Sequence, residues 1–223
     1  MHNKPILSIG NKNYSSWSLR PWLAMRWAGI AFQERVIPLG PRGAGPNEAI
    51  LAINPAGTVP VLELHDGAQI WDSLAICEWA NDAAQNSLLW PTDPVTRAIA
   101  RSAVAEMHAG FAPLRMQFPM NLKRIKHDHV WDEAASANIA RIDALLGGLV
   151  QRFDLAGSGW LFGHRTIVDA FYAPVATRFR TYQVPLSPLT QKWCDTLYAD
   201  PEFQAWERDA LRETWVIGET DTI

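Results

Sequence analysis

Strand-like runs occur only near the beginning of this chain, and helical periodicity takes over after them. Four short runs have the apolar, β-branched or aromatic character of strands: residues 6–9, 32–37, 61–64 and 68–71. From about residue 88 onward, apolar residues instead recur at spacings of three and four, which indicates helices. We therefore expect a small α/β domain over residues 1–84 and an all-helical domain over residues 85–223.

The order of elements in the first part predicts the topology of its sheet. An amphipathic run over residues 16–28 lies between the first two strand-like runs, so these two strands should be parallel with a right-handed crossover. The last two runs flank Asp66-Gly67, a dipeptide that suits a tight turn and predicts an antiparallel hairpin. Asp72-Ser73 then opens another helical pattern.

Caps and prolines mark the helix boundaries of the second part. Asp93-Pro94 is an N-cap followed by proline at the first helical position, and it opens an apolar stripe that ends near Phe118. Pro113 and Pro119 interrupt this stripe, so we expect a kink rather than one straight helix. Further helices are expected over residues 139–153, from Thr166 with Asp169 three positions later, and from Asp200-Pro201.

The composition excludes several classes of function. Of the 223 residues, 48% are apolar and 19% are charged, which is typical of a globular protein. A net charge of −3 leaves no basic footprint for nucleic acid, and no apolar run is long enough to span a membrane. Cys77 and Cys194 lie in helical patterns, which predicts no disulfide framework and fits a reducing cytoplasm. His127 and His129 supply too few ligands for a metal site, so we expect none.

Hydroxyl side chains gather where the first strand passes into the first helix, over residues 13–20. The free N–H groups and the positive end of a helix dipole can hold an anion at such a place. Ser15 and Ser18 have the C-x-x-C spacing of thiol redox proteins, with serine in place of both thiols. In a thioredoxin-like fold, the loop would therefore stabilise a thiolate that belongs to a ligand. The alternative is ordinary N-capping of the helix.

Four segments carry a resemblance to the soluble glutathione transferases, nearest to the zeta class. They occur in order and on the expected elements, and each is weak alone. Residues 15–20 resemble the S-S-C-S-W-R signature of the zeta class, residues 54–60 the N-P-x-x-x-V-P segment with a cis proline, residues 72–76 the [EQD]-S-x-A-I element, and residues 163–169 the capping segment of the C-terminal domain. The resemblance implies a thioredoxin-like N-terminal domain, an all-helical C-terminal domain and glutathione as co-substrate.

The resemblance implies roles for the hydroxyl groups of the first loop. Ser15 corresponds to the serine that faces the thiol of glutathione and would stabilise the thiolate by a hydrogen bond. Ser16 is near enough in sequence to share or take this catalytic role, and Tyr14 is a third candidate beside the substrate. Trp17 replaces the cysteine of the zeta signature, which weakens the transfer of the zeta isomerase activity to this chain.

The other two N-terminal segments would bind the rest of glutathione. Val59 would pair its backbone with the cysteinyl part, as an added strand does, with Thr58 and Pro60 beside it. Ser73 and Asp72 would bind the carboxylate and the ammonium of the γ-glutamyl end, and both can also serve as ordinary helix caps.

The remaining partners of the site are less constrained by sequence. Arg42 is a candidate for the glycyl carboxylate, whereas Arg20 is expected to join a structural ion pair. The electrophile would lie against the first long helix of the second domain, whose candidate lining residues are Met107, His108, Phe111, Leu114, Arg115 and Phe118.

Three functions remain open for such a chain. The first hypothesis is a cytoplasmic, homodimeric glutathione transferase that conjugates the thiolate of glutathione to a small hydrophobic electrophile. The second is a glutathione-dependent cis-trans isomerase of the maleylacetoacetate type, and the third is a non-catalytic glutathione-binding or ligand-carrying module. Glutathione-dependent reduction also stays open.

Overall fold

A computed structural model describes residues 4–41, 44–45, 47–85 and 88–222 of the chain. Its first half holds one mixed four-stranded sheet with the strand order β2-β1-β3-β4. The elements of this half are β1 (Ile6–Ile9), α1 (Ser16–Trp27), β2 (Gln33–Val36), α2 (Glu48–Leu51), β3 (Val61–Glu63), β4 (Gln69–Trp71) and α3 (Ser73–Ala83). β1 and β2 are parallel, whereas β1 with β3 and β3 with β4 are antiparallel. The predicted topology is confirmed.

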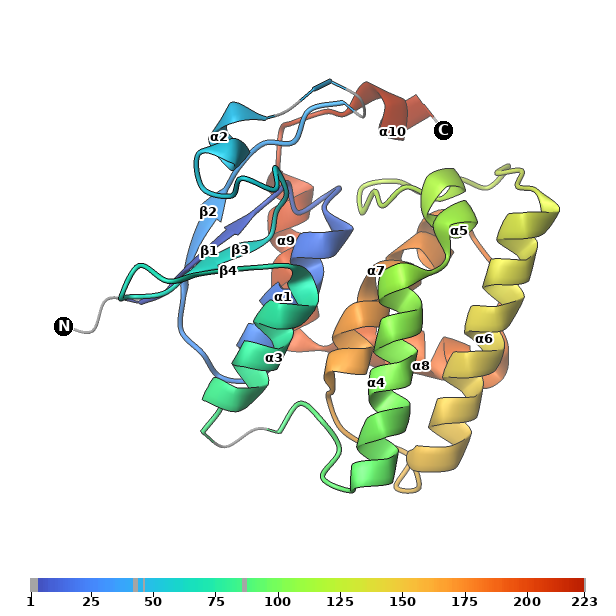
Figure 1. The fold of residues 1–223 in the computed structure, drawn as a ribbon. Coiled ribbons are helices and arrows are strands. Elements are labelled where there is room, and N and C mark those ends of the chain that lie inside the picture. Colours follow the sequence, from blue (N-terminus) through green and yellow to red (C-terminus); the bar gives the residue numbers. More distant parts are fainter. Residues whose placement is uncertain (1–3, 42–43, 46, 86–87, 223) are drawn as a thin grey trace.

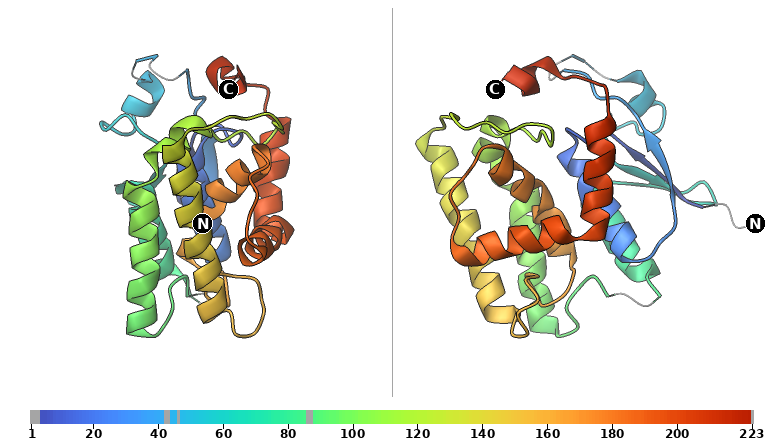
Figure 2. Two further views of the ribbon diagram at one scale, coloured as in Figure 1. Left: turned by 90° about the vertical axis from the view of Figure 1, so that its right-hand side faces the viewer. Right: turned by 180° about the vertical axis from the view of Figure 1, so that it is seen from behind.

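Helices alone make up the described second half. They are α4 (Pro94–Ala109), α5 (Ala112–Gln117), α6 (Glu133–Phe153), α7 (Ile167–Thr181), α8 (Pro188–Ala199), α9 (Pro201–Arg212) and α10 (Gly218–Thr222). Figure 1 shows this helical half beside the sheet, with α1 and α3 between the two. Figure 2 shows that α9 returns to the sheet half and that α10 ends near the loops at one end of the sheet. The architecture is the expected one, an α/β half followed by a helical half.

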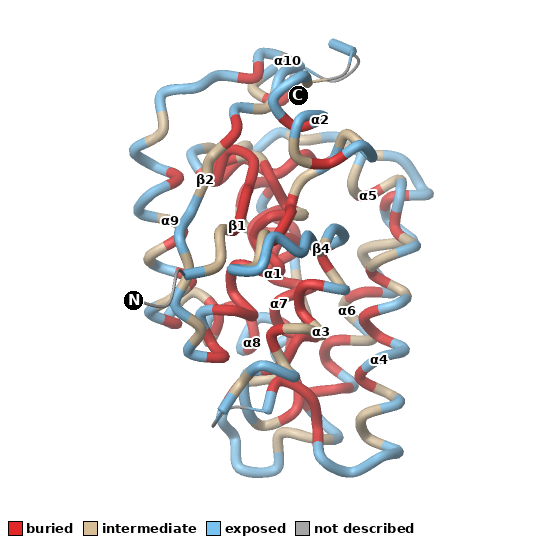
Figure 3. The backbone as a smooth tube through the Cα atoms, turned by 60° about the vertical axis from the view of Figure 1, so that its left-hand side comes forward, coloured by how far each residue is buried: buried red, intermediate tan, exposed pale blue. Residues whose placement is uncertain are grey.

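Helix α1 lies in the middle of the molecule. It packs against α3 on its own side and against α7 and α9 from the helical half. Figure 3 shows that α1 and α7 are buried over most of their length. Because neighbours cover α1 on nearly all sides, its few polar side chains are buried as well, including Ser18 and Arg20. The N-terminus of α1 therefore opens where the two halves of the molecule meet.

The interruption predicted in the first long helical stripe is present, but it precedes Pro113. Helix α4 ends at Ala109, and Phe111 has a left-handed backbone with φ of 60°. Pro113 then occupies the first turn of α5, where a missing N–H costs nothing because no intrahelical acceptor faces it. The turn at Gly110–Phe111, rather than the proline, separates the two helices.

The predicted cap of α7 is formed and also joins α8 to the core. Asp169 is fully buried, and its Oδ2 accepts the N–H and the hydroxyl of Thr166 at 2.8 and 2.6 Å. Its Oδ1 accepts the indole N–H of Trp193 at 2.9 Å and the N–H of Leu161 at 3.2 Å. Four donors thus satisfy a carboxylate that burial alone would make costly. No helix of the described chain has the length and apolar character required to cross a bilayer.

Candidate functional site

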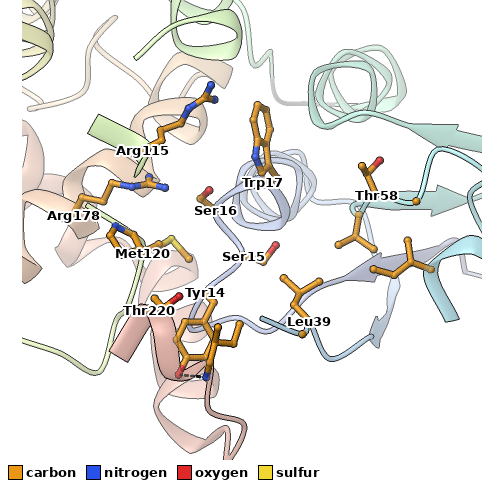
Figure 4. Close-up of a pocket in the computed structure, with 16 residues that line it drawn as sticks. Tyr14, Ser15, Ser16, Trp17, Leu39, Thr58, Arg115, Met120, Arg178 and Thr220 are labelled. Carbon is orange, nitrogen blue, oxygen red and sulfur yellow. Dashed lines mark hydrogen bonds between the residues drawn. The ribbon is translucent and has the colours of Figure 1, made fainter. Parts of the chain in front are cut away.

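Two adjacent cavities lie at the N-terminus of α1. The larger, of about 460 Å³, is lined by residues 14–17, by Thr58 and Val59, and by side chains of the helical half (Figure 4). The smaller, of about 320 Å³, is lined by Trp17, Thr58, Val59, Pro60, Asp72 and Ser73. Trp17, Thr58 and Val59 border both cavities, so the two cavities are neighbours. The sequence-predicted segments at residues 14–17, 58–60 and 72–73 are thus brought together.

Ser15 is the N-cap residue of α1, but its side chain makes no capping hydrogen bond to the helix. Its hydroxyl donates to Oγ of Ser18 at 2.7 Å, and Ser18 Oγ also accepts the N–H of Gly10 at 3.0 Å. Ser15 is 5% exposed and Ser18 is fully buried. The two serines that have the C-x-x-C spacing therefore contact each other, and Ser15 retains acceptor sites toward the cavity.

The hydroxyls of Ser16 and Tyr14 are placed differently from that of Ser15. Figure 4 shows Ser16 on the side of Arg115 and Arg178, whereas Ser15 lies on the side of Thr58. The hydroxyl of Tyr14 donates to Oδ2 of Asp221 at 3.0 Å. Burial raises the pKa of the Tyr14 phenol, and the Asp221 carboxylate adds to this increase. The Tyr14 hydroxyl is therefore engaged by the C-terminal segment and stays protonated at neutral pH.

The small cavity presents backbone and side-chain groups that suit an amino-acid ligand. The Val59-Pro60 peptide bond is cis, as expected. Asp72 caps α3 by accepting the N–H of Leu74 at 2.8 Å. The hydroxyl of Ser73 is buried and has no hydrogen-bond partner among the described residues. Because buried polar groups are nearly always paired, this hydroxyl is ready for a ligand.

The other predicted site residues are dispersed. Arg42 lies outside the described residues. Met107 is fully buried, and neither it nor Phe111 lines either cavity. His108 lies beside the site, with its Nε2 at 3.4 Å from Oδ2 of Asp72 and its ring centroid 5.4 Å from that of Trp17. Arg115 does line the larger cavity. Leu114 and Phe118 are fully buried and line neither cavity.

Several residues that line the larger cavity were not predicted from the sequence. Arg178 of α7 and Met120 of the loop after α5 line the larger cavity, as do Ile217 and Thr220 near the C-terminus. No local motif marks these four positions, since each reaches the site through the packing of distant segments.

The C-terminal segment forms its wall because side chains hold it to the first loop. Glu213 accepts the N–H groups of Lys12 and Asn13 at 2.6 and 2.9 Å. Asp221 accepts from Asn121 at 2.6 Å, besides its bond from Tyr14. Lys12 and Glu213 are 201 positions apart in the sequence. A segment distant in sequence from the first loop thus forms this side of the cavity.

The combined site can hold an extended ligand with an anion at the N-terminus of α1. A hydroxyl and the helix dipole face this position from one side, and cationic side chains lie across the cavity. Both cysteines are free and buried, and neither lines either cavity, so the described chain offers no thiol of its own there. Within the described residues no group of His, Cys, Asp or Glu side chains suits a metal ion. The arrangement can therefore stabilise the thiolate of a bound molecule.

Comparison with known proteins identifies relatives of this chain. Residues 14–83 match the family described as glutathione S-transferase, N-terminal domain. The maleylacetoacetate isomerase of Pseudomonas aeruginosa is 27% identical over 203 residues, which cover 86% of this chain and 91% of that protein. The isomerase of Rattus norvegicus is 29% identical over 83% of this chain and 82% of its own length. The solved maleylacetoacetate isomerase of Anaeromyxobacter dehalogenans, with bound GSH in the active site, has a TM-score of 0.68 at 24% identity, over 96% of this chain and 100% of that chain.

Proposed function

We propose that this chain, whose residues 14–83 match the N-terminal domain family of glutathione S-transferases, binds glutathione and transfers the thiolate to a small electrophile. One observation carries the proposal. The unpartnered hydroxyl of Ser73, the cis Val59-Pro60 segment and Ser15 surround two adjacent cavities. These are the groups that the γ-glutamyl end, the cysteinyl backbone and the thiol of glutathione require.

Glutathione would occupy the small cavity and reach into the larger one. The backbone of Val59 pairs with the cysteinyl part in this arrangement, with Thr58 and Pro60 beside it. Ser73 binds the α-carboxylate of the γ-glutamyl end through its hydroxyl, which removes the unpaired polar group. Asp72 accepts from the ammonium group with Oδ2, while its Oδ1 continues to cap α3.

The thiol would then lie beside Ser15. The hydroxyl of Ser15 turns from Ser18 to the sulfur and donates a hydrogen bond that favours the thiolate. Ser18 has a hydroxyl proton of its own and can donate it to Ser15, while the N–H of Gly10 continues to donate to Ser18. A chain of three donors thus ends on the sulfur, and the thiol proton leaves to solvent. Ser16 is the second candidate for this contact.

With an aryl halide, the reaction is a substitution at carbon. The thiolate attacks the ring carbon that bears the halogen, a carbon–sulfur bond forms, and the carbon–halogen bond breaks with its electron pair on the halide. The enzyme contributes position and thiolate stabilisation, and it needs no acid group for the leaving halide.

An isomerase activity is the second candidate, because two relatives whose alignments cover more than four fifths of this chain are maleylacetoacetate isomerases. There the thiolate would add to a double bond, allow rotation about the resulting single bond, and leave again unchanged. Trp17, in place of the cysteine of the zeta signature, is the observation against it.

We also propose a homodimer in the cytoplasm. Trp71 on β4 is 59% exposed beside a hollow lined by Ile53, Pro55 and Ala56, which supports a contact between copies. The buried free thiols of Cys77 and Cys194 are compatible with a reducing compartment. Sedimentation of the wild type and of Trp71→Glu tests the dimer, and two monomeric samples would contradict it.

Retention on immobilised glutathione and a substrate panel test the main proposal. We expect retention, conjugation of 1-chloro-2,4-dinitrobenzene, and a Kd for glutathione raised about tenfold in Ser73→Ala. Ser102→Ala removes an exposed hydroxyl on α4 and should leave all three results unchanged. A maleyl substrate in the same panel separates isomerisation from transfer. No retention and no turnover of either substrate would refute both enzymatic functions.

A further inference from the structure

Two arginine side chains pack against Trp17, where the two halves of the molecule meet, and a third arginine lines the same cavity as Trp17. They come from different helices: Arg20 from α1, Arg115 from α5 and Arg178 from α7. The guanidinium carbon of Arg20 lies 4.0 Å from the centre of the Trp17 ring, and that of Arg115 lies 5.2 Å from it. Such distances are those of guanidinium groups stacked on an aromatic ring. Trp17 therefore packs against two cations.

Two of these cations have no anionic partner within the described part of the chain. All three guanidinium nitrogens of Arg20 and Nη1 of Arg115 are buried without a hydrogen bond. Burial, together with the charges of Arg178 and Arg115, lowers the pKa of Arg20 to about 9. The ion pair expected for Arg20 is absent from the described residues. Its guanidinium packs against the rings of Trp17 and Phe171, and the Asp72 carboxylate acts on it only from a longer distance. Buried unpaired charge is costly, so this cluster indicates an anionic ligand.

The cluster faces the cavity in which the electrophile would lie. Trp17, Arg115 and Arg178 line the same cavity as Ser15 and Ser16. In Figure 4, Arg178 reaches toward Ser16 and Arg115 lies near the Trp17 indole. A flat molecule against Trp17 would thus have arginines at one end and the thiolate position at the other. Arg20 lies behind Trp17, fully buried, and adds positive potential without touching the ligand.

We propose that the electrophile of this protein is a planar aromatic molecule with a carboxylate, which Arg115 and Arg178 bind while its ring stacks on Trp17. The inference rests on the proposed function and specifies its substrate class. A guanidinium group matches a carboxylate by two parallel hydrogen bonds, and Nη1 of Arg115 is buried with no competing acceptor. Trp17 supplies the flat apolar surface that such a ring requires.

Two electrophiles that differ in one group test the proposal. In 4-chloro-3,5-dinitrobenzoate and its carboxamide, the same ring carbon loses chloride to the thiolate, but only the first carries a charge. We expect the wild type to prefer the benzoate in kcat/KM. Arg115→Gln should lower kcat/KM for the benzoate about tenfold to a hundredfold and change that for the carboxamide little. Trp17→Leu should raise KM for both, because both rings lose the stacking surface.

Arg152→Gln is the matched control, since Arg152 is an exposed arginine at the end of α6. Equal losses for the two electrophiles in Arg115→Gln would overturn the proposal. So would a raised KM for glutathione with no change for the benzoate, because Arg115 would then bind the glycyl carboxylate instead. Circular dichroism checks that each variant is folded.

A binding measurement separates this inference from the proposed function. The chlorine-free 3,5-dinitrobenzoate cannot react, and calorimetry gives its Kd in the presence of glutathione. A lower Kd for this acid than for its amide in the wild type, with no such difference in Arg115→Gln, supports the carboxylate site even if no conjugation occurs. If the chlorinated benzoate and its carboxamide are both conjugated with no preference for the benzoate, the transferase function stands and the inference is refuted.

Discussion

Removal of the Ser15 hydroxyl should raise the pKa of the bound glutathione thiol. A free thiol of this type has a pKa of about 8.5. A hydrogen bond to a charged group contributes about 1.5–3 kcal/mol, and one pKa unit corresponds to about 1.4 kcal/mol, so Ser15→Ala should shift the thiol upward by about one to two units. The helix should remain stable, because the Ser15 side chain makes no capping hydrogen bond.

Ser18 provides a second measurement of the same bond. It contacts Ser15 at 2.7 Å and is fully buried, so we expect it to act on the thiol only through Ser15. Ser18→Ala should raise the thiol pKa by about half a unit to one unit, which is the effect of a neutral hydrogen bond. In the Ser15→Ala background, the same change should add nothing, because the link to the sulfur is already gone.

The assay is the ultraviolet absorbance of the thiolate in glutathione-saturated enzyme, titrated against pH. The pH profile of kcat/KM for conjugation should move with it. Ser16→Ala is the control, since Ser16 lies on the side of the arginines and should leave the thiol pKa nearly unchanged. An unshifted titration in Ser15→Ala refutes the reasoning, and a shift in Ser16→Ala alone assigns the contact to Ser16.

The remaining predictions concern the C-terminal segment and the stability of the helical half. Asp221→Asn removes the charge that accepts from Tyr14, so we expect faster proteolysis of the C-terminal segment and a KM for the electrophile raised about threefold to tenfold. Asp169→Asn replaces a buried carboxylate that accepts four hydrogen bonds. This change should lower the free energy of unfolding, measured with denaturant, by about 2–4 kcal/mol. For Asp154, burial opposes ionisation, but hydrogen bonds from Ser158 and a neighbouring N–H outweigh it and leave its pKa below the usual value. The stabilising effect of the Asp154 carboxylate is therefore present above its pKa in the unfolded chain and is lost as the pH falls through its pKa in the folded protein. Asp154→Asn should lower the thermal midpoint at pH 7, and the midpoints of the variant and the wild type should converge in acid.

Much of the fold was predictable because its signals are local. The hairpin depends on Asp66-Gly67, and the cap of α7 depends on Thr166 with Asp169 three residues later. The break between α4 and α5 was predicted near Pro113, but it occurs at Gly110–Phe111, because Phe111 adopts a left-handed backbone and the proline fits the following first turn. The prolines thus indicated that the stripe is interrupted, but they did not locate the residue that interrupts it.

The candidate site divides in the same way. Ser15, Val59 and Ser73 belong to short motifs, and the structure places all three beside adjacent cavities. Arg178 and Thr220 have no local signal and were missed. Met107 was predicted to line the site because it belongs to the apolar stripe of α4, but it is fully buried. Helical spacing alone does not tell which face of α4 meets the core.

The sequence alone determined the order of the two halves and the position of the serine loop before α1, because strand periods, turns and caps depend on residues close together in the chain. Only the tertiary structure decided what that loop faces. It engaged Tyr14 with Asp221 and brought arginines of α5 and α7 to the same cavity as Trp17. These pairings join residues as many as 207 positions apart, and packing of the whole chain, rather than any local preference, sets them.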